Sequence, residues 1–363
     1  MFSKSALNQL HYGFTLVEMM VSIALSVTIM SGVVQMLVFN KNIFIMEHEL
    51  ATIQENARYV VRILADEIHM AGFTGCNSQA LSYANSVKGS SGNWYLAGAG
   101  IQGFDYKAGR KSFPKEFRAD ILPNTDAIVI RRGDASGLRL TSMQNIASAV
   151  IPLASRHPYK SGQIMMITTP DCQQVGVFQL SGPGNASNTA TSMEHAAGSS
   201  TQGNCTSNLA GNFSCNSLAA SLALEYPSGS NLMALSSAAY YVGVSSNDAG
   251  VPTLHRERLL LNTNTHTIYT AAEELVQGVE YMQILYGFDA DNNDNIPDIY
   301  VGADYPGLHW DKVKSVRLAL RLRSALPVYN KKVNYPEFEQ IKGSDGSDRF
   351  MRQLVETTIT LRN

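Results

Sequence analysis

The feature that most constrains the fold is an uncharged run of 21 residues, 19–39, which follows a single acidic residue, Glu18. A run of this length spans a bilayer as a helix. Residues 1–13 before it are mostly polar and carry Lys4 as their one fixed positive side chain. Because positive side chains favour the cytoplasmic side, the bulk of the chain is predicted outside the cytoplasm. No small-residue cleavage site follows Phe39, so the run is predicted to stay as a single-pass anchor.

The helical pattern does not stop at the end of this run. Beyond residue 39, apolar side chains recur at intervals of three and four residues, which gives a helix one apolar face. This apolar seam consists of Met46, Leu50, Ile53, Ala57, Val60, Leu64, Ile68 and Ala71. Gly72 follows where a helix C-terminal glycine is typical, and no proline occurs before Pro114. The sequence therefore predicts one helix over residues 14–71, with a membrane half of about 14–39 and an amphipathic second half.

The region after Gly72 has the pattern of a β domain. Residues 316–323 alternate apolar and mostly basic side chains, as expected of a strand with one wet face. Further strands are predicted over residues 125–132, 162–169, 175–180, 238–244, 281–288 and 354–362, whereas residues 181–221 lack periodicity and are predicted to form a long loop. The predicted fold class is α+β: a long N-terminal helix packed on a C-terminal antiparallel β-sheet domain, residues 72–363.

The stretch GFTLVE, residues 13–18, stands where the polar leader meets the apolar helix. This combination resembles the type IV pilin family. The resemblance implies a leader, residues 1–13, that a prepilin peptidase removes between Gly13 and Phe14, after which the same enzyme methylates the amine of Phe14. It also implies an assembly role for Glu18, whose carboxylate is costly in a membrane unless it pairs with the amine of a neighbouring subunit.

Several downstream segments narrow the resemblance to the PilW minor pilins: residues 55–76, 236–244, 275–301 and 313–324. This resemblance implies a structural, non-catalytic minor pilin that primes filament assembly and sits at or near the tip. The implied partners are other minor pilins, the major pilin, a large tip adhesin and the inner-membrane assembly platform. The implied location is the inner membrane, with the bulk in the periplasm and later at the cell surface. Two alternatives remain: a J-type pseudopilin of type II secretion, or a tip adhesin that binds through residues 181–235.

The chain has four cysteines, Cys76, Cys172, Cys205 and Cys215, and no two are spaced as a CxxC pair. A sparse, even set is consistent with two disulfides in an oxidising compartment. Cys205 and Cys215 are close enough in sequence to join within the predicted loop, which leaves Cys76 for Cys172. Four cysteines allow three pairings, so the connectivity stays open.

One acidic loop, residues 289–298, has the alternating oxygen side chains of a calcium-binding loop. The candidate ligands are Asp289, Asp291, Asn293, Asn295 and Asp298. Asp294 stands at the position that usually holds glycine, and Tyr300 at the position of the terminal glutamate. The two readings are therefore a weak Ca²⁺ site, which is not a required cofactor, and an Asx-rich turn.

Other classes of function find little support in the composition. A net charge of −2 gives no electrostatic basis for nucleic-acid binding. The stretch GAGIQG, residues 98–103, fits a dinucleotide fingerprint, but the glycine and proline that follow it disfavour the required helix. No nucleophile, base and orienting group can be named together, so the chain is predicted not to be an enzyme.

Overall fold

The computed structural model describes residues 13, 15–75, 82–90, 92–96, 99–134, 137–142, 149–183, 190–198, 202–215, 226–248, 250–291, 294, 296–333 and 348–362. The chain divides into two compact units, Met1–Ala51 and Thr52–Asn363. The helix α1, Leu16–His69, contributes to both units and is continuous over its 54 residues. The part of α1 from Thr52 onward thus belongs to the same compact unit as the β strands.

The end of α1 lies two residues before the predicted end. The N–H groups of Met70 and Ala71 donate to carbonyls three residues earlier, at 3.2 and 3.1 Å, so the last turn is tighter than an α-helix. Gly72 then adopts φ +77°, which a residue with a Cβ rarely tolerates, and its N–H donates to the Arg131 carbonyl at 2.9 Å. The predicted terminating role of Gly72 is confirmed.

The apolar seam of α1 is confirmed within the second unit. Each of its members from Ile53 to Ala71 is at most 4% exposed: Ile53, Ala57, Val60, Leu64, Ile68 and Ala71. These side chains share one core cluster with apolar residues of the sheets, among them Ile128, Ile130, Tyr240, Val242, Leu318 and Leu320. The helix therefore forms part of the main core of this unit rather than a cover on its surface.

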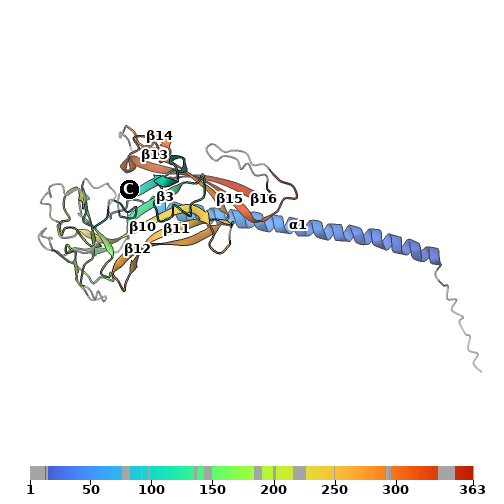
Figure 1. Ribbon diagram of the computed structural model, residues 1–363, viewed down its shortest axis with the longest axis horizontal. Helices are drawn as coiled ribbons and strands as arrows, with labels where there is room; N and C mark the ends of the chain where they lie inside the picture. The colour runs from blue at the N-terminus through green and yellow to red at the C-terminus, as the bar shows by residue number, and fades with distance from the viewer. Residues whose placement is uncertain are drawn as a thin grey trace, which may run out of the picture. The chain divides into compact units, whose positions relative to one another are not determined.

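The larger sheet has ten strands. Its main path runs β12-β11-β10-β6-β7-β1-β9, with β2, β3 and β4 joined through β3 and β10. Figure 1 shows β10, β11 and β12 side by side. The strands are β1 Ser82–Asn85, β2 Ile101–Phe104, β3 Ala127–Gly133, β4 Leu138–Arg139, β6 Ile164–Thr168, β7 Gln174–Gln179, β9 Phe213–Ser214, β10 Asn231–Val244, β11 Pro252–Asn262 and β12 Thr267–Gln277.

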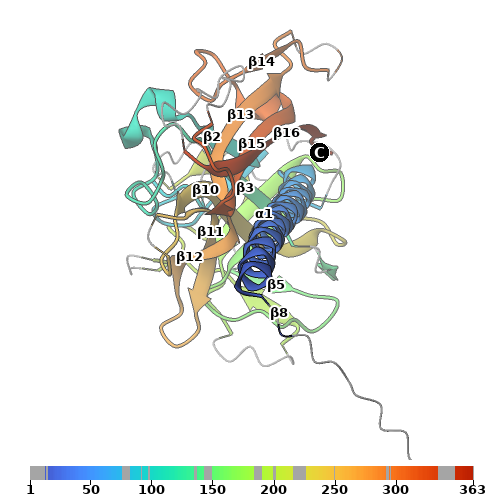
Figure 2. The ribbon, with the colours of Figure 1, turned by 90° about the vertical axis from the view of Figure 1, so that its right-hand side faces the viewer.

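A second sheet of four strands has the order β14-β13-β15-β16 and is antiparallel throughout (Figure 2). Its strands are β13 Val279–Phe288, β14 Ile299–Val301, β15 Val313–Pro327 and β16 Phe350–Thr360. A small sheet pairs β5 Val150–Pro152 with β8 Ser192–Glu194, and three short 3-10 helices are η1 Tyr106–Ala108, η2 Arg110–Ser112 and η3 Trp310–Lys312. The predicted α+β class is confirmed.

The alternating strand β15 is confirmed, but its predicted wet face is not. Its apolar members, Val316, Leu318, Leu320 and Leu322, are at most 1% exposed. On the other face Arg321 is only 5% exposed. Aromatic rings cover this face, because the guanidinium carbons lie 4.0–4.6 Å from ring centroids in the pairs Arg317–Tyr300, Arg321–Tyr281 and Arg323–Phe350.

Two further expectations about the β domain need correction. The larger sheet is mixed rather than antiparallel, because β1 pairs in parallel with both β7 and β9. Within residues 181–221, the described segments carry β8 and β9, so this stretch is not loop throughout. Residues 101–103 of the stretch GAGIQG lie in β2, so a strand stands where a dinucleotide-binding helix is required.

Candidate functional site

The N-terminus of α1 is closed by two side chains that bond reciprocally. The Thr15 backbone N–H donates to Glu18 Oε2 at 2.9 Å, and the Glu18 backbone N–H donates to Thr15 Oγ1 at 3.3 Å. The Thr15 hydroxyl also donates to Glu18 Oε2, at 3.0 Å. This arrangement is a capping box, in which a residue at the N-cap and one three positions later satisfy each other's N–H groups.

The predicted role of Glu18 is in assembly, and no capping role of Thr15 was predicted. The signal was present, because a threonine followed three residues later by a glutamate, just before an apolar run, is the usual signature of a capping box. Gly13 is exposed, and nothing lies within 4 Å of where a Cβ would stand. Phe14, the predicted methylated residue, lies outside the described residues.

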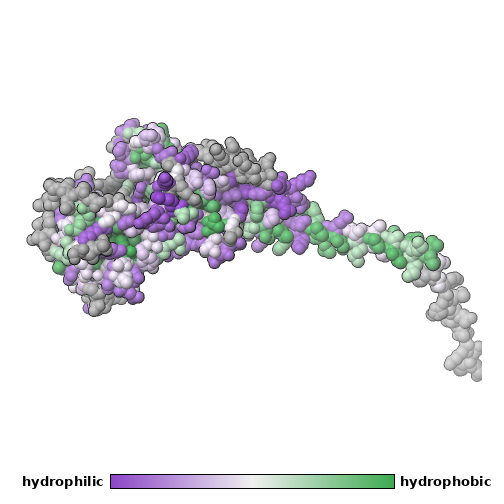
Figure 3. Space-filling view, in the orientation of Figure 1, coloured by the Kyte–Doolittle hydropathy of each residue, from purple (hydrophilic) through white to green (hydrophobic). Residues whose placement is uncertain are grey.

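Residues 16–39 of α1 present an apolar surface. Their large apolar side chains are 47–75% exposed, and Figure 3 shows hydrophobic residues along the N-terminal part of the helix. Four hydroxyl side chains of this segment, Ser22, Ser26, Thr28 and Ser31, donate to carbonyls three or four residues earlier, at 2.7–2.8 Å. Internal bonds of this kind leave no hydroxyl donor unsatisfied in a lipid environment. Among the described residues, α1 is the one helix long and apolar enough to cross a membrane.

The acidic loop brings three of the predicted ligands together. Asp289, Asp291 and Asp298 each have a carboxylate oxygen within 4.8 Å of the other two. Asp298 Oδ2 accepts the backbone N–H groups of Ala290 at 2.8 Å and Asp291 at 3.3 Å, which holds the loop in a tight turn. Of the other candidates, Asn293 and Asn295 lie outside the described residues.

Two protein-family models match the chain, one near each end. Residues 9–34 match the prokaryotic N-terminal methylation motif, and residues 239–363 match the family of type IV pilus-assembly protein W. These two matches support a PilW-like type IV pilin. No curated protein and no solved structure matches it significantly.

The two matches correspond to the two functional parts of this pilin. The motif covers the end of the predicted leader, the capping box and most of the apolar segment. It implies processing by a prepilin peptidase and assembly with other pilins. The PilW match begins within β10 and includes β11 to β16, the strands that supply much of the core around α1. Pilin-family domains are structural components.

One disulfide of the pilin is defined. Cys205 and Cys215 are bonded, with 5.9 Å between their Cα atoms, as the sequence predicted. The two cysteines are 10 positions apart in the sequence, and Cys215 directly follows β9. Strand β9, Phe213–Ser214, pairs with β1. Cys76 lies outside the described residues, so its bond to Cys172 stays a prediction.

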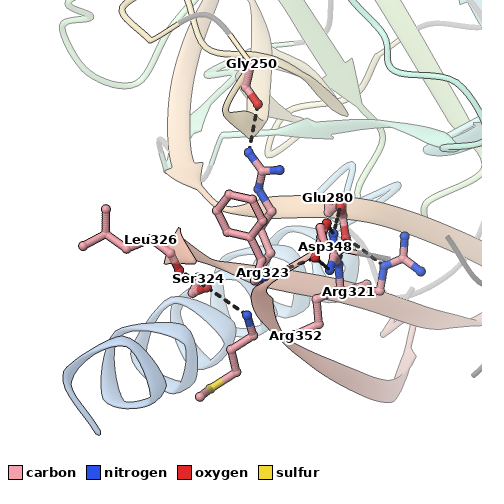
Figure 4. Close-up of polar contacts among 10 residues, drawn as sticks. Gly250, Glu280, Arg321, Arg323, Ser324, Leu326, Asp348 and Arg352 are labelled. Atoms are coloured by element: carbon pink, nitrogen blue, oxygen red, sulfur yellow. Dashed lines mark hydrogen bonds and ion pairs between the residues drawn. The ribbon is translucent and has the colours of Figure 1, made fainter. Parts of the chain in front are cut away.

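A buried charge network fastens the PilW-matched sheet (Figure 4). Glu280 accepts from Arg321 Nε at 3.0 Å and from Arg352 Nε at 2.7 Å, and Arg352 also pairs with Asp348 at 2.6 Å. The side chains of Arg321 and Arg352 are only 6% and 4% exposed. Burial alone raises the pKa of the Glu280 carboxyl, but the bonds and charges of Arg352 and Arg321 outweigh it and lower that pKa. The network joins three strands, β13, β15 and β16, on the face away from the core.

Proposed function

We propose that this chain is a minor pilin that primes type IV pilus assembly and sits at or near the filament tip, in a structural and non-catalytic role. The observation that carries the proposal is the junction of two parts in one helix. A processing motif and an apolar segment form the first part of α1, and the rest of α1 is core to the domain that bears the PilW match. A chain of this kind can leave the membrane only together with its folded domain, as an assembling subunit does.

We propose different partners for processing of the leader and for initiation of the filament. A prepilin peptidase processes the leader, and the chain then waits in the inner membrane with its bulk in the periplasm. Other minor pilins, the major pilin, a large tip adhesin and the inner-membrane assembly platform are the partners we propose for filament initiation. The final location is the pilus tip at the cell surface.

Glu18 has a defined part in this proposal. Removal of the leader creates a positive amine on Phe14, the residue next to the Thr15 N–H that Glu18 accepts. The Glu18 carboxylate therefore lies within one residue of a new positive charge at a helix N-terminus, where negative charge is favoured. In a bundle of apolar helices, the amine of Phe14 and the carboxylate of a neighbour form the pair that sets the register of docking.

Variants at Glu18 and Thr15 test this role in cells that lack their own copy of the gene. Glu18→Gln keeps the capping-box geometry but removes the charge, and Glu18→Val removes both. Both variants should insert in the membrane, because the cost of a charge is gone, yet fail to restore filaments. Thr15→Ala is the matched control, since it removes the cap at a cost of about 1 kcal/mol and keeps the charge, and it should restore filaments. Normal piliation from Glu18→Gln would contradict the charge pairing.

We also propose that the acidic loop binds Ca²⁺ weakly. The gathering of the Asp289, Asp291 and Asp298 carboxylates supports this, because hard oxygen ligands suit Ca²⁺. A ligand that binds only the folded state raises the melting temperature. The full chain in detergent should therefore melt higher in millimolar calcium than in EDTA. Asp291→Asn should abolish the shift, whereas Asp294→Asn, in the same loop but outside the three-carboxylate group, should keep it. An equal shift in both variants would reduce the loop to a turn.

A further inference from the structure

A pocket of about 430 Å³ lies over β2, on the face of the larger sheet opposite α1. The faces are defined by alternation, since Ile128 and Ile130 of β3 belong to the core around α1, whereas Ala127 and Val129 belong to a separate cluster. Residues 92–94, 102, 104, 112–116 and 118 line the pocket, and Trp94 and Phe113 among them belong to this second cluster (Figure 2, blue-green turns beside β2). The volume is within the range of small-molecule sites, about 300–1,000 Å³.

Aromatic side chains form the apolar part of the pocket. Trp94, Phe104 and Phe113 line it. The rings of Phe104 and Phe113 lie 6.0 Å apart, and Trp94 packs edge-on against Phe117 at 6.1 Å. Phe113 is fully buried and Phe104 is half-buried, so Phe104 presents ring surface above a fixed aromatic base. A ring surface of this kind accepts the apolar C–H face of a cyclic ligand.

Two amide side chains of the pocket, those of Gln102 and Asn93, are each held by one hydrogen bond. The other polar atom of each amide remains available to a ligand. Gln102 Oε1 accepts from Arg131 Nη2 at 2.7 Å, and its Nε2 has no hydrogen bond within the described part of the chain. Asn93 Nδ2 donates to the Gly89 carbonyl at 3.1 Å, which leaves its Oδ1 as an acceptor. Arg131 also donates to the Trp94 carbonyl at 2.6 Å and is itself buried, so it acts as a positioning residue for both walls.

The lining also contains charged side chains, of which some accept hydrogen bonds and others donate them. The carboxylate of Glu116 is an acceptor, and the ammonium of Lys115 a donor. Arg118 contributes less, since its Nε and Nη2 both donate to the Phe113 carbonyl.

We propose that this pocket binds a saccharide. A sugar ring has apolar C–H faces for the Phe104 ring and hydroxyls that both donate and accept, which matches the mixed lining. A purely apolar ligand leaves these polar groups unpaired. The proposed site is separate from residues 181–235 and does not depend on the filament role.

The chain offers a direct reporter, since it has two tryptophans, Trp94 and Trp310. Trp310 packs against Tyr286 at 4.9 Å and lies outside the pocket lining, so Trp310→Phe keeps an aromatic ring there and leaves Trp94 as the one fluorophore of its kind. The full-length variant, in a detergent without a sugar headgroup, is titrated with methyl β-galactoside, N-acetylglucosamine and N-acetylneuraminic acid. We expect a saturable change of Trp94 emission with at least one probe at millimolar concentration or below.

Two variants in this background assign the change to the pocket. Gln102→Ala removes the oriented Nε2 donors and should weaken binding about tenfold, the equivalent of one lost hydrogen bond of about 1.4 kcal/mol. Gln173→Ala is the matched control, because Gln173 is exposed and is not part of the pocket lining. This variant should bind the sugar as tightly as the parent does. Lys115→Ala distinguishes an acidic sugar from a neutral one as the ligand, since it should weaken the binding of an acidic sugar more.

The outcomes are decisive in both directions. A saturable response that Gln102→Ala weakens and Gln173→Ala does not supports the saccharide site. The absence of a saturable response to all three probes overturns it. A response that Gln102→Ala leaves unchanged overturns it as well, provided that circular dichroism shows each variant folded.

Discussion

Removal of residues 1–71 tests the part that α1 plays in the globular domain. A fragment that begins at Gly72 keeps every strand but loses the apolar seam from Ile53 to Ala71, whose members are at most 4% exposed. Four of them are large side chains: Ile53, Val60, Leu64 and Ile68. Burial of a Val, Leu or Ile side chain contributes about 1.5–3 kcal/mol, so these four contribute about 6–12 kcal/mol. This is comparable with the whole stability of a typical domain, about 5–15 kcal/mol.

The expected result is that fragment 72–363 does not fold cooperatively, whereas fragment 52–363, the compact unit of the structure, does. Urea unfolding followed by near-ultraviolet circular dichroism measures both. A finer version of the test uses fragment 52–363 alone. There Leu64→Ala should lower the free energy of unfolding by about 2–5 kcal/mol, and Arg62→Ala, an exposed neighbour, by less than about 0.5 kcal/mol. Equal unfolding midpoints for the two fragments would refute the assignment of α1 to the core.

The remaining predictions concern the charge network and the cysteines. Glu280→Gln should lower the free energy of unfolding by about 3–5 kcal/mol, since it leaves the buried guanidinium groups short of a carboxylate, and urea titration measures it. Because the pKa of Glu280 is lowered in the folded state, its contribution is present at neutral pH and is lost as the pH falls through that pKa, so acid should destabilise wild type more than Glu280→Gln. Reduction of the Cys205–Cys215 bond should lower stability by about 2–3 kcal/mol in thermal melts. Non-reducing peptide mapping should recover Cys76 linked to Cys172, and a different partner for Cys76 would contradict that pairing.

The helix and the alternating strand could be predicted because their patterns are local. The seam of α1 repeats at the helical period, and Gly72 marks its end, so both followed from residue spacing alone. The predicted position of β15 was correct for the same reason. Its basic face was predicted wet because the sequence does not show which aromatic ring will cover a given arginine. That covering comes from β13, β14 and β16, whose rings are distant in sequence from the arginines that they cover, as in the pair Arg321–Tyr281.

The hairpin of β11 and β12 was not predicted, because its support lies across strands rather than along them. Two adjacent glutamates, Glu273 and Glu274, interrupt the alternation of β12. In the structure, Glu273 pairs with Arg256 and Arg258 of β11, and Glu274 accepts from Ser245 and Ser246. Cross-strand pairs of this kind stabilise a sheet without leaving a period in either strand.

The sequence predicted one part of the functional residues, the motif at the N-terminus, but not the cap of the helix or the pocket. The motif around Gly13 and Glu18 was identified, and the family comparison supports it. The capping role of Thr15 was overlooked because Glu18 had been explained by assembly alone. The saccharide pocket could not be predicted, since its walls come from residues 92–94, 102–104 and 112–118, and only the fold brings these together.

The most direct test of the central claim is the N-terminal mass of the protein purified from cells with an active prepilin peptidase. We expect a mature chain that begins with N-methylated Phe14. A bulky Gly13→Val variant should stay uncut, whereas Gly13→Ala keeps a small residue at the cut and should still be processed. A chain that begins at Met1 in wild type, or one cut after residue 39, would contradict the identification of this protein as a processed pilin.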